Sequence, residues 1–219
     1  MENVKQDLPT RVKLILAAER LLGERGFQHV SVKEILAAAG QRNESALQYH
    51  FGSRAGLIAA VFAYRVDQIE ARRIELLNAL EAEGRSGDLR AVLGAALGPL
   101  VEVMDSEDKY YLLFAVQALF DPKFDLPSFI EAPSMDGLGR AVSWIRAAVP
   151  DLPDHVFGMR LRLAIETSIG AMARWIRAET APDSHAQALF VSNLLDTAEA
   201  ILRAPLSGES ARIIKETAS

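Results

Sequence analysis

The hydrophobic pattern repeats with a helical period along nearly the whole 219-residue chain. Apolar residues recur three and four positions apart, and no stretch shows the strict apolar–polar alternation of a half-buried strand. Glycine, proline and N-capping residues divide this pattern into segments of helical length. We therefore expect an all-α fold with nine helices and no β-sheet.

Capping signals place the first two helices. Gly26 ends a helix over about 8–25, because glycine adopts the left-handed backbone of a C-cap without steric cost. Ser31 and Glu34 have the spacing of a capping box, in which two side chains satisfy free backbone amides at a helix start. This box predicts a short second helix over 32–39.

The same reasoning divides the rest of the chain. Asn43 is a good N-cap for a third, short helix over 44–50, and Ser53 caps a long fourth helix that reaches about residue 83. The remaining helices are expected over 88–105, 107–120, the second half of 127–149, 153–178 and 182–204. Residues 205–219 are expected to form a loose tail.

Composition narrows the class of protein. The chain has no cysteine, which excludes a disulfide scaffold, a thiol nucleophile and a cysteine-ligated metal. No apolar run reaches the roughly 18 residues of a membrane span, and the first residues do not lead into a signal peptide. We expect a cytoplasmic protein without membrane contact.

Charge is distributed unevenly along the chain. Residues 1–56 hold 8 Lys/Arg and 6 Asp/Glu, a balance of +2, whereas residues 57–219 hold 16 and 23, a balance of −7. A polyanion would therefore approach the N-terminal end more readily than the rest.

The second and third expected helices, joined by a tight turn at Gly40, have the arrangement of a helix-turn-helix. In this motif the second helix enters the major groove of DNA. Ala46 is expected to contact a thymine methyl group, and Ser45 and Gln48 are expected to hydrogen-bond to bases. The residues suited to phosphate oxygens, which set the register on DNA, are Ser31, Tyr49, His50 and Arg54.

Several short runs within residues 10–62 match a known family pattern in order and spacing. They are Ile15–Ala18 (ILAA), Gly26–Phe27, Val30–Val32 with Ile35, Ala38–Gly40, and Leu47–Arg54 (LQYHFGSR) with Leu57. Through these residues the chain resembles the TetR family of transcriptional regulators.

The resemblance implies two domains. The first is a three-helix DNA-binding domain over 8–54, followed by a linking helix from 53 to about 83. The second, over 55–204, is a six-helix domain that binds a small ligand and forms a homodimer, with 205–219 as a tail. Family members of this kind are usually repressors that leave a near-palindromic operator when the ligand binds.

The resemblance also assigns roles and shows two departures. Asn43 stands where the family has a capping Ser or Thr, Arg54 where it has a phosphate-contacting Lys, and Ser31 where a Thr touches the DNA backbone. The turn through residues 41–43 is one residue longer than usual, which makes Arg42 a new candidate for DNA contact. The common family Tyr is replaced by Gln48, with Tyr49 next to it. Glu44 is expected to accept from a cytosine amino group or to complement the helix N-terminus.

Ligand and dimer contacts are expected in the C-terminal part. Large apolar side chains there suit a packed core or the wall of a ligand cavity, in which a few polar groups orient the ligand. The acidic balance of this part favours a lipophilic, neutral or cationic ligand. The candidate ligand-binding residues are Tyr64, Met104, Tyr111, Phe114, Gln117, Trp144 and Arg146. The candidate dimer residues, on faces rich in small and apolar side chains, are Leu161, Ala164, Ile165, Ser168, Ala171, Met172, Trp175, Leu194 and Ala198.

No pattern indicates catalysis or a cofactor. The sequence has no nucleophile elbow and no phosphate-binding glycine loop, and its four histidines lack the paired spacing of metal ligands. A ligand-released repressor is therefore the first hypothesis. The alternatives are an activator, a regulator that needs a co-repressor, or a helical small-molecule-binding protein or enzyme that no longer uses its DNA-binding motif.

Overall fold

A computed structural model of the chain describes residues 8–43, 45–104, 106–121, 125–178 and 184–217. Within these ranges the chain forms helices and no strand, as its hydrophobic period predicts. The α-helices are α1 Thr10–Arg25, α2 Val32–Ala38, α3 Ser45–Phe51, α4 Arg54–Ala82, α5 Leu89–Met104, α6 Tyr110–Leu119, α7 Leu126–Ile130, α8 Asp136–Ala147, α9 Asp154–Arg177, α10 Ser184–Arg203 and α11 Gly208–Thr217.

Two of these helices exceed the nine expected. The short helix α7 is capped by Asp125, whose carboxylate accepts a hydrogen bond from the Ser128 amide at 3.3 Å. Helix α11 lies in the segment expected to be a loose tail. The Ser207 hydroxyl caps it by accepting from the Ser210 amide at 3.1 Å, and Ile214 packs against the core of the bundle.

The caps of the N-terminal helices are confirmed. The Ser31 hydroxyl accepts from the Glu34 amide at 3.3 Å, and the Glu34 carboxylate accepts from the Ser31 amide at 2.8 Å. Gly26 ends α1 with a φ of +85°, a value that favours glycine. Ser53 caps α4 by accepting from the Gly56 amide at 3.0 Å.

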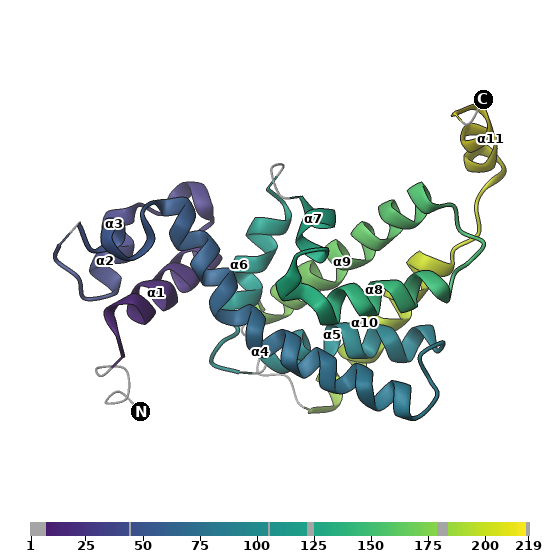
Figure 1. Ribbon diagram of the computed structural model, residues 1–219, viewed down its shortest axis with the longest axis horizontal. Coiled ribbons are helices and arrows are strands. Elements are labelled where there is room, and N and C mark those ends of the chain that lie inside the picture. The colour runs from purple at the N-terminus through teal and green to yellow at the C-terminus, as the bar shows by residue number, and fades with distance from the viewer. Residues whose placement is uncertain (1–7, 44, 105, 122–124, 179–183, 218–219) are drawn as a thin grey trace.

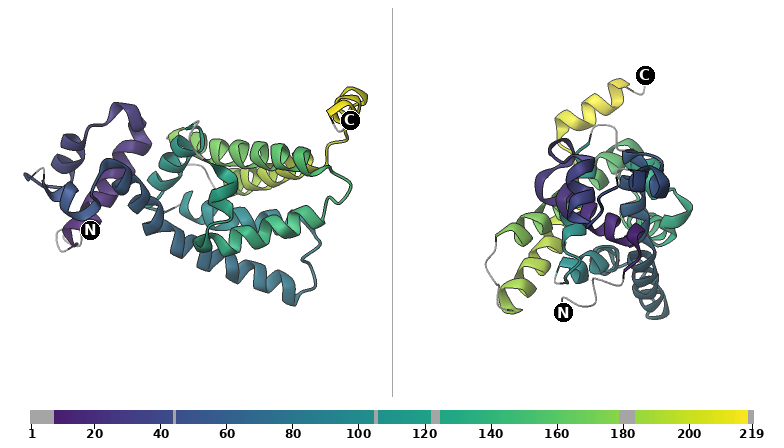
Figure 2. Two further views of the ribbon diagram at one scale, coloured as in Figure 1. Left: turned by 45° about the horizontal axis from the view of Figure 1, so that its top comes forward. Right: turned by 90° about the vertical axis from the view of Figure 1, so that its left-hand side faces the viewer.

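The molecule is elongated, with α1–α3 at one end and the bundle of α5–α10 at the other (Figure 1). Helix α4 runs from the first group along the bundle, and α11 projects from the far end (Figure 2). The buried side chains form two large clusters. One lies at the far end, among α4, α5, α8, α9 and α10.

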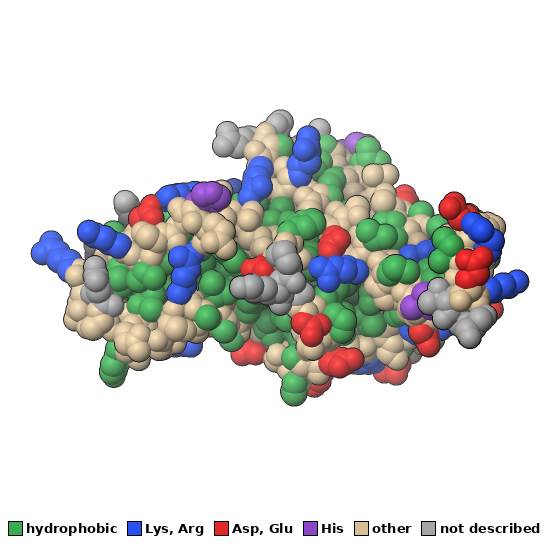
Figure 3. Space-filling model, turned by 90° about the horizontal axis from the view of Figure 1, so that it is seen from above, with side chains coloured by type: hydrophobic (Ala, Val, Ile, Leu, Met, Phe, Trp, Pro, Cys, Tyr) green, Lys and Arg blue, Asp and Glu red, His purple; other side chains and the backbone are tan. Residues whose placement is uncertain are grey.

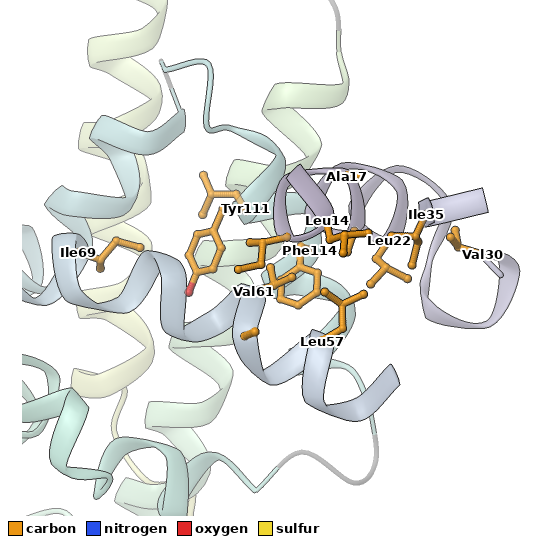
Figure 4. Close-up of a cluster of buried hydrophobic side chains, with 14 of the residues drawn as sticks. Leu14, Ala17, Leu22, Val30, Ile35, Leu57, Val61, Ile69, Tyr111 and Phe114 are labelled. Carbon is orange, nitrogen blue, oxygen red and sulfur yellow. The ribbon is translucent and has the colours of Figure 1, made fainter. Parts of the chain in front are cut away.

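The other cluster joins the small N-terminal group of helices to the bundle (Figure 4). It contains Leu14 and Ile35 from the N-terminal helices together with Tyr111 and Phe114 from α6 and Met172 from α9. The two parts of the chain therefore do not fold around separate cores.

Close backbone packing reinforces this junction. A Cβ atom on Gly23 of α1 would lie 2.9 Å from both the Phe114 amide nitrogen and the Tyr110 carbonyl oxygen of α6. Only glycine permits this approach, because any side chain would have to push α1 and α6 apart. The Arg177 guanidinium of α9 adds a hydrogen bond of 3.1 Å to the Gly23 carbonyl.

A buried ion cluster also crosses the junction. The Arg65 guanidinium of α4 donates to both carboxylate oxygens of Glu19 on α1, at 2.7 and 2.8 Å, and lies 2.8 Å from the Asp108 carboxylate before α6. Arg65 and Glu19 side chains are only 7% and 3% exposed, whereas that of Asp108 is 46% exposed. Burial raises the pKa of Glu19, although Arg65 opposes that shift.

Candidate functional site

The exposed face of α3 and the turn before it form the first candidate site. Ser45, Gln48 and Tyr49 are three and four residues apart, so they lie on one helix face, and all three are exposed. Tyr49 is 84% exposed, the highest value among the exposed large hydrophobic residues. Arg42 and Asn43 in the preceding turn are exposed beside them. We call Arg42, Asn43, Ser45, Gln48 and Tyr49 the recognition surface.

Asn43 shapes the start of α3. Its side-chain oxygen accepts from the Ser45 amide at 3.0 Å and from the Ser45 hydroxyl at 2.7 Å. Asn43 thus caps α3, as expected. Glu44, the other residue expected to act at this helix end, lies outside the described residues.

The carboxylates of α1 and α2 are all paired with arginine side chains. Glu19 pairs with Arg65, Glu24 with Arg20 at 3.1 Å, and Glu34 with Arg25 at 2.8 Å. Within the described part of the chain, Arg42 and Lys33 have no ion-pair partner and remain exposed. On the face shown in Figure 3, blue side chains predominate over red ones at the end that holds α1–α3, while red ones gather farther along the molecule.

Three residues expected to contact DNA make contacts within the protein instead. The Arg54 guanidinium is half-buried and donates to the carbonyl oxygens of Val30, at 2.7 Å, and Phe27, so it fastens α4 to the segment before α2. We therefore do not assign it a phosphate contact. Ala46 packs against the core, which leaves its methyl group little free surface for a thymine. His50 is half-buried with its ring between those of Tyr49 and Phe51.

Ser31 stays exposed at the N-terminus of α2. Its hydroxyl group donates to the Glu34 carboxylate at 2.7 Å in addition to accepting the amide hydrogen bond of the capping box. Hydrogen bonds from the Ser31 amide and hydroxyl, together with the nearby Arg25, lower the pKa of Glu34 to about 2. The structural role of Ser31 is therefore clear, and a phosphate contact remains a prediction.

A cavity inside the bundle forms the second candidate site. Its volume is about 110 Å³, and its wall is built by side chains from α4 to α10. Most of the wall is aliphatic, and one side is aromatic. On that side the Phe62 ring centroid lies 6.4 Å from that of Tyr111 and 6.0 Å from that of Phe129. The polar residues in the wall are Glu70, Arg73, Tyr111 and Ser168.

Glu70 and Arg73 form a buried ion pair on α4. Their side chains are only 7% and 3% exposed. Glu70 also accepts from the Leu138 amide at 3.0 Å, and Arg73 donates to the Ala96 carbonyl at 2.9 Å. Burial lowers the pKa of Arg73 to about 10, so the group still carries its charge at neutral pH.

Of the seven expected ligand residues, the cavity includes only Tyr111. Met104 and Phe114 are buried in the core that joins the two parts of the chain. Tyr64 lies on the outer side of α4 against Arg65. Trp144 lies under Arg140, Arg146 pairs with Asp154 at 2.8 Å, and Gln117 lines a separate surface hollow. These six residues therefore lie outside the wall of this cavity, and a ligand contact by any of them remains a prediction.

Sequence reasoning missed Glu70 and Arg73, although a signal was present. Val66, Ile69, Glu70, Arg73 and Leu77 follow the spacing of one buried helix face. Two opposite charges three residues apart on an apolar stripe indicate a pair that is buried together, because a single buried charge would be too costly.

The nine residues expected at a dimer interface lie mainly inside one chain. Leu161, Ala164, Ser168, Met172, Leu194 and Ala198 are buried, and Ile165, Ala171 and Trp175 are half-buried. Helices α9 and α10 turn this face toward α5 and α6 of their own chain, where five of the nine residues line the cavity. These residues therefore pack mainly within one chain, and a dimer contact through them remains a prediction.

Comparison with known proteins agrees with the geometry of the first site. Residues 14–61, which span α1 to the first turns of α4, match the model of the bacterial regulatory proteins of the tetR family. The N-terminal part of the chain is therefore similar to the DNA-binding part of this family. This match supports a DNA-binding regulator, and it places the helix-turn-helix in the N-terminal part of an all-α fold.

Comparison with curated protein sequences gives no match. Among solved structures, the chain is similar to RolR in complex with the ligand resorcinol, with 20% sequence identity and a TM-score of 0.44. That likeness covers 94% of this chain and 98% of RolR. Among the helices described for this chain, none has the length and apolarity needed to cross a membrane.

Proposed function

We propose that the protein is a homodimeric repressor that leaves its operator when a small lipophilic molecule occupies the cavity. The observation that carries this proposal is that α4 and α6 each serve both sites. Leu57 and Val61 of α4 and Phe114 of α6 belong to the core shared with the DNA-binding helices. Ile69, about two turns farther along α4, and Ala115, next to Phe114 on α6, line the cavity.

This arrangement gives a physical route for regulation. A helix is a stiff element, so a ligand that shifts α4 or α6 at the cavity also shifts the DNA-binding helices packed on them. The coupling can be no larger than the difference in the ligand's affinity for the two states, commonly about 1–3 kcal/mol.

Two copies are proposed to assemble through the outer face of α9 and α10. Met159 and Leu163, which are four residues apart on α9, are 57% and 52% exposed, and Leu189 on α10 is 66% exposed. Large exposed apolar groups on adjoining helices suit an interface with a second copy. In the dimer, two recognition surfaces would enter successive major grooves about 34–36 Å apart, on a near-palindromic operator.

DNA binding is tested first, with the purified protein and the intergenic DNA upstream of its own gene. We expect fluorescence anisotropy to show binding that resists competition by unrelated DNA of equal length. Gln48→Ala should weaken specific binding by about 1–3 kcal/mol if Gln48 reads a base. Gln68→Ala, an exposed glutamine of α4 outside the recognition surface, is the matched control and should bind like the parent protein. Equal affinity of both variants would contradict the assigned surface.

The dimer is tested by sedimentation. We expect Leu163→Asp to yield monomers, because it places a charge at the centre of the proposed interface. Ile213→Asp changes a similarly exposed residue, 51% exposed on α11, and should remain dimeric. If both variants remain dimeric, the outer face of α9 and α10 is not the interface.

A further inference from the structure

Two hydroxyl groups face the cavity without a partner. Tyr111 and Ser168 belong to α6 and α9, line the cavity and are only 5% and 2% exposed. Neither hydroxyl has a hydrogen bond to any of the residues that the structure describes. The Tyr111 ring reaches from α6 toward α4, with its oxygen at the α4 side (Figure 4).

A hydroxyl group in a largely apolar cavity wall has few groups to bond to, and a hydrogen bond to a bound molecule would compensate for the loss of bulk water. Burial also raises the pKa of Tyr111 to about 12, so its phenol stays protonated and can donate. A bound molecule with an oxygen near Tyr111 or Ser168 would satisfy these groups.

The charged residues of the wall favour a neutral molecule. Glu70 and Arg73 neutralise each other and are also held by backbone groups of Leu138 and Ala96. No described residue offers an unpaired charge to the cavity. A charged ligand would therefore lose its hydration without gaining a counter-ion.

Size and shape restrict the molecule further. The cavity of about 110 Å³ is close to an engineered apolar cavity of roughly 150 Å³ that takes benzene. Phe62, Tyr111 and Phe129 offer ring faces and edges on one side, which suit an aromatic ring.

We propose that the cavity binds a neutral compound with one ring and one or two hydroxyl or carbonyl oxygens, which hydrogen-bond to Tyr111 and Ser168. This inference rests on the proposed function, since it names the class of molecule that would release the repressor from DNA.

The experiment measures binding to the full chain without DNA, by calorimetry at pH 7. The probes are phenol, toluene and benzoate, which share one ring and differ in the hydroxyl group and the charge. We expect phenol to bind about 3- to 10-fold more tightly than toluene, which corresponds to one hydrogen bond, and benzoate to bind more weakly than phenol. Tyr111→Phe should remove most of the preference for phenol and leave toluene binding unchanged.

Two further variants serve as controls and tests. Tyr49→Phe makes the same chemical change at an exposed site and should keep the phenol preference. Ser168→Ala should reduce the preference as Tyr111→Phe does, if the second hydroxyl also contacts the ligand. Equal binding of phenol and toluene in the parent protein, tightest binding of benzoate, or no binding of any probe would each overturn the proposal.

A DNA-binding measurement with the same probes tests the ligand class separately from the proposed ligand-released repressor. If specific DNA binding is present but none of the probes binds, the ligand class is wrong and the regulator remains. If phenol binds through Tyr111 but does not release specifically bound DNA, the ligand class holds and the ligand-released repressor is wrong.

Discussion

Replacing Arg65 with methionine is expected to destabilise the protein strongly. Arg65→Met keeps a long side chain but leaves the Glu19 carboxylate, only 3% exposed, without its bidentate partner. Breaking a buried ion pair from one side costs about 3–5 kcal/mol. For a protein of this size that corresponds to a fall in Tm of roughly 6–20 °C, measurable by calorimetry.

The chain offers a matched control on the same helix. Arg72 of α4 also has two carboxylate partners, Glu102 at 2.9 Å and Glu75 at 3.0 Å, but its side chain is 44% exposed. Arg72→Met should therefore change the Tm far less than Arg65→Met does, because solvent screens an exposed ion pair. The double variant Glu19→Leu, Arg65→Met should recover most of the loss, because it leaves no buried charge.

The pH dependence follows from the raised pKa of Glu19. Burial already raises that pKa in the folded state, and removing Arg65 takes away the group that opposes the shift. A carboxyl whose folded pKa is raised favours folding below its unfolded pKa, and this contribution is lost as the pH rises through the folded value. The deficit of Arg65→Met relative to the parent should thus shrink as the pH is lowered and Glu19 takes up a proton. Equal losses for Arg65→Met and Arg72→Met, or a deficit independent of pH, would refute the reasoning.

Other perturbations probe the caps, the α1–α6 contact and the electrostatics of DNA binding. Ser31→Ala should destabilise the protein by about 1 kcal/mol through loss of the α2 cap, as seen in denaturant titrations. Gly23→Ala should destabilise the protein by about 1–3 kcal/mol, because its Cβ would lie 2.9 Å from the α6 backbone. The control Gly94→Ala, whose Cβ would have its nearest neighbour at 3.9 Å, should be neutral or stabilising. Similar melting temperatures for the two variants would contradict the close contact. Arg42→Ala should reduce the slope of log affinity against log salt by about 1, and Arg212→Ala on α11 should leave it unchanged. An unaltered slope for Arg42→Ala would mean that Arg42 does not contact a phosphate.

The sequence predicts the local structure of this chain well, because local structure depends on neighbouring residues. The helix ends at Gly26, Ser31, Asn43 and Ser53 follow from capping chemistry within a few positions. The helical period also separates buried from exposed positions along each helix.

Periodicity does not indicate which element covers a buried face, and the main differences between expectation and structure arise for this reason. The apolar stripe of α9 and α10 that includes Leu161 and Leu194 is indeed buried, but against the same chain instead of a second copy. Arg54 follows the family pattern in sequence, yet its direction depends on carbonyl groups more than twenty residues away. The ion cluster of Glu19 and Arg65 joins residues 46 positions apart, a distance at which no local rule operates.

The shared core has a practical consequence for engineering sensors from this protein. Exchanging DNA-binding domains between regulators usually assumes that a cut near the start of α4 separates two independent folding units. Here such a graft would lose the Glu19 partner of Arg65 and the close fit of Gly23 against α6. A chimera that keeps the donor's α1 together with its own α6 and the Arg65 segment of α4 should express as a folded protein, whereas one cut at Ser53 should aggregate.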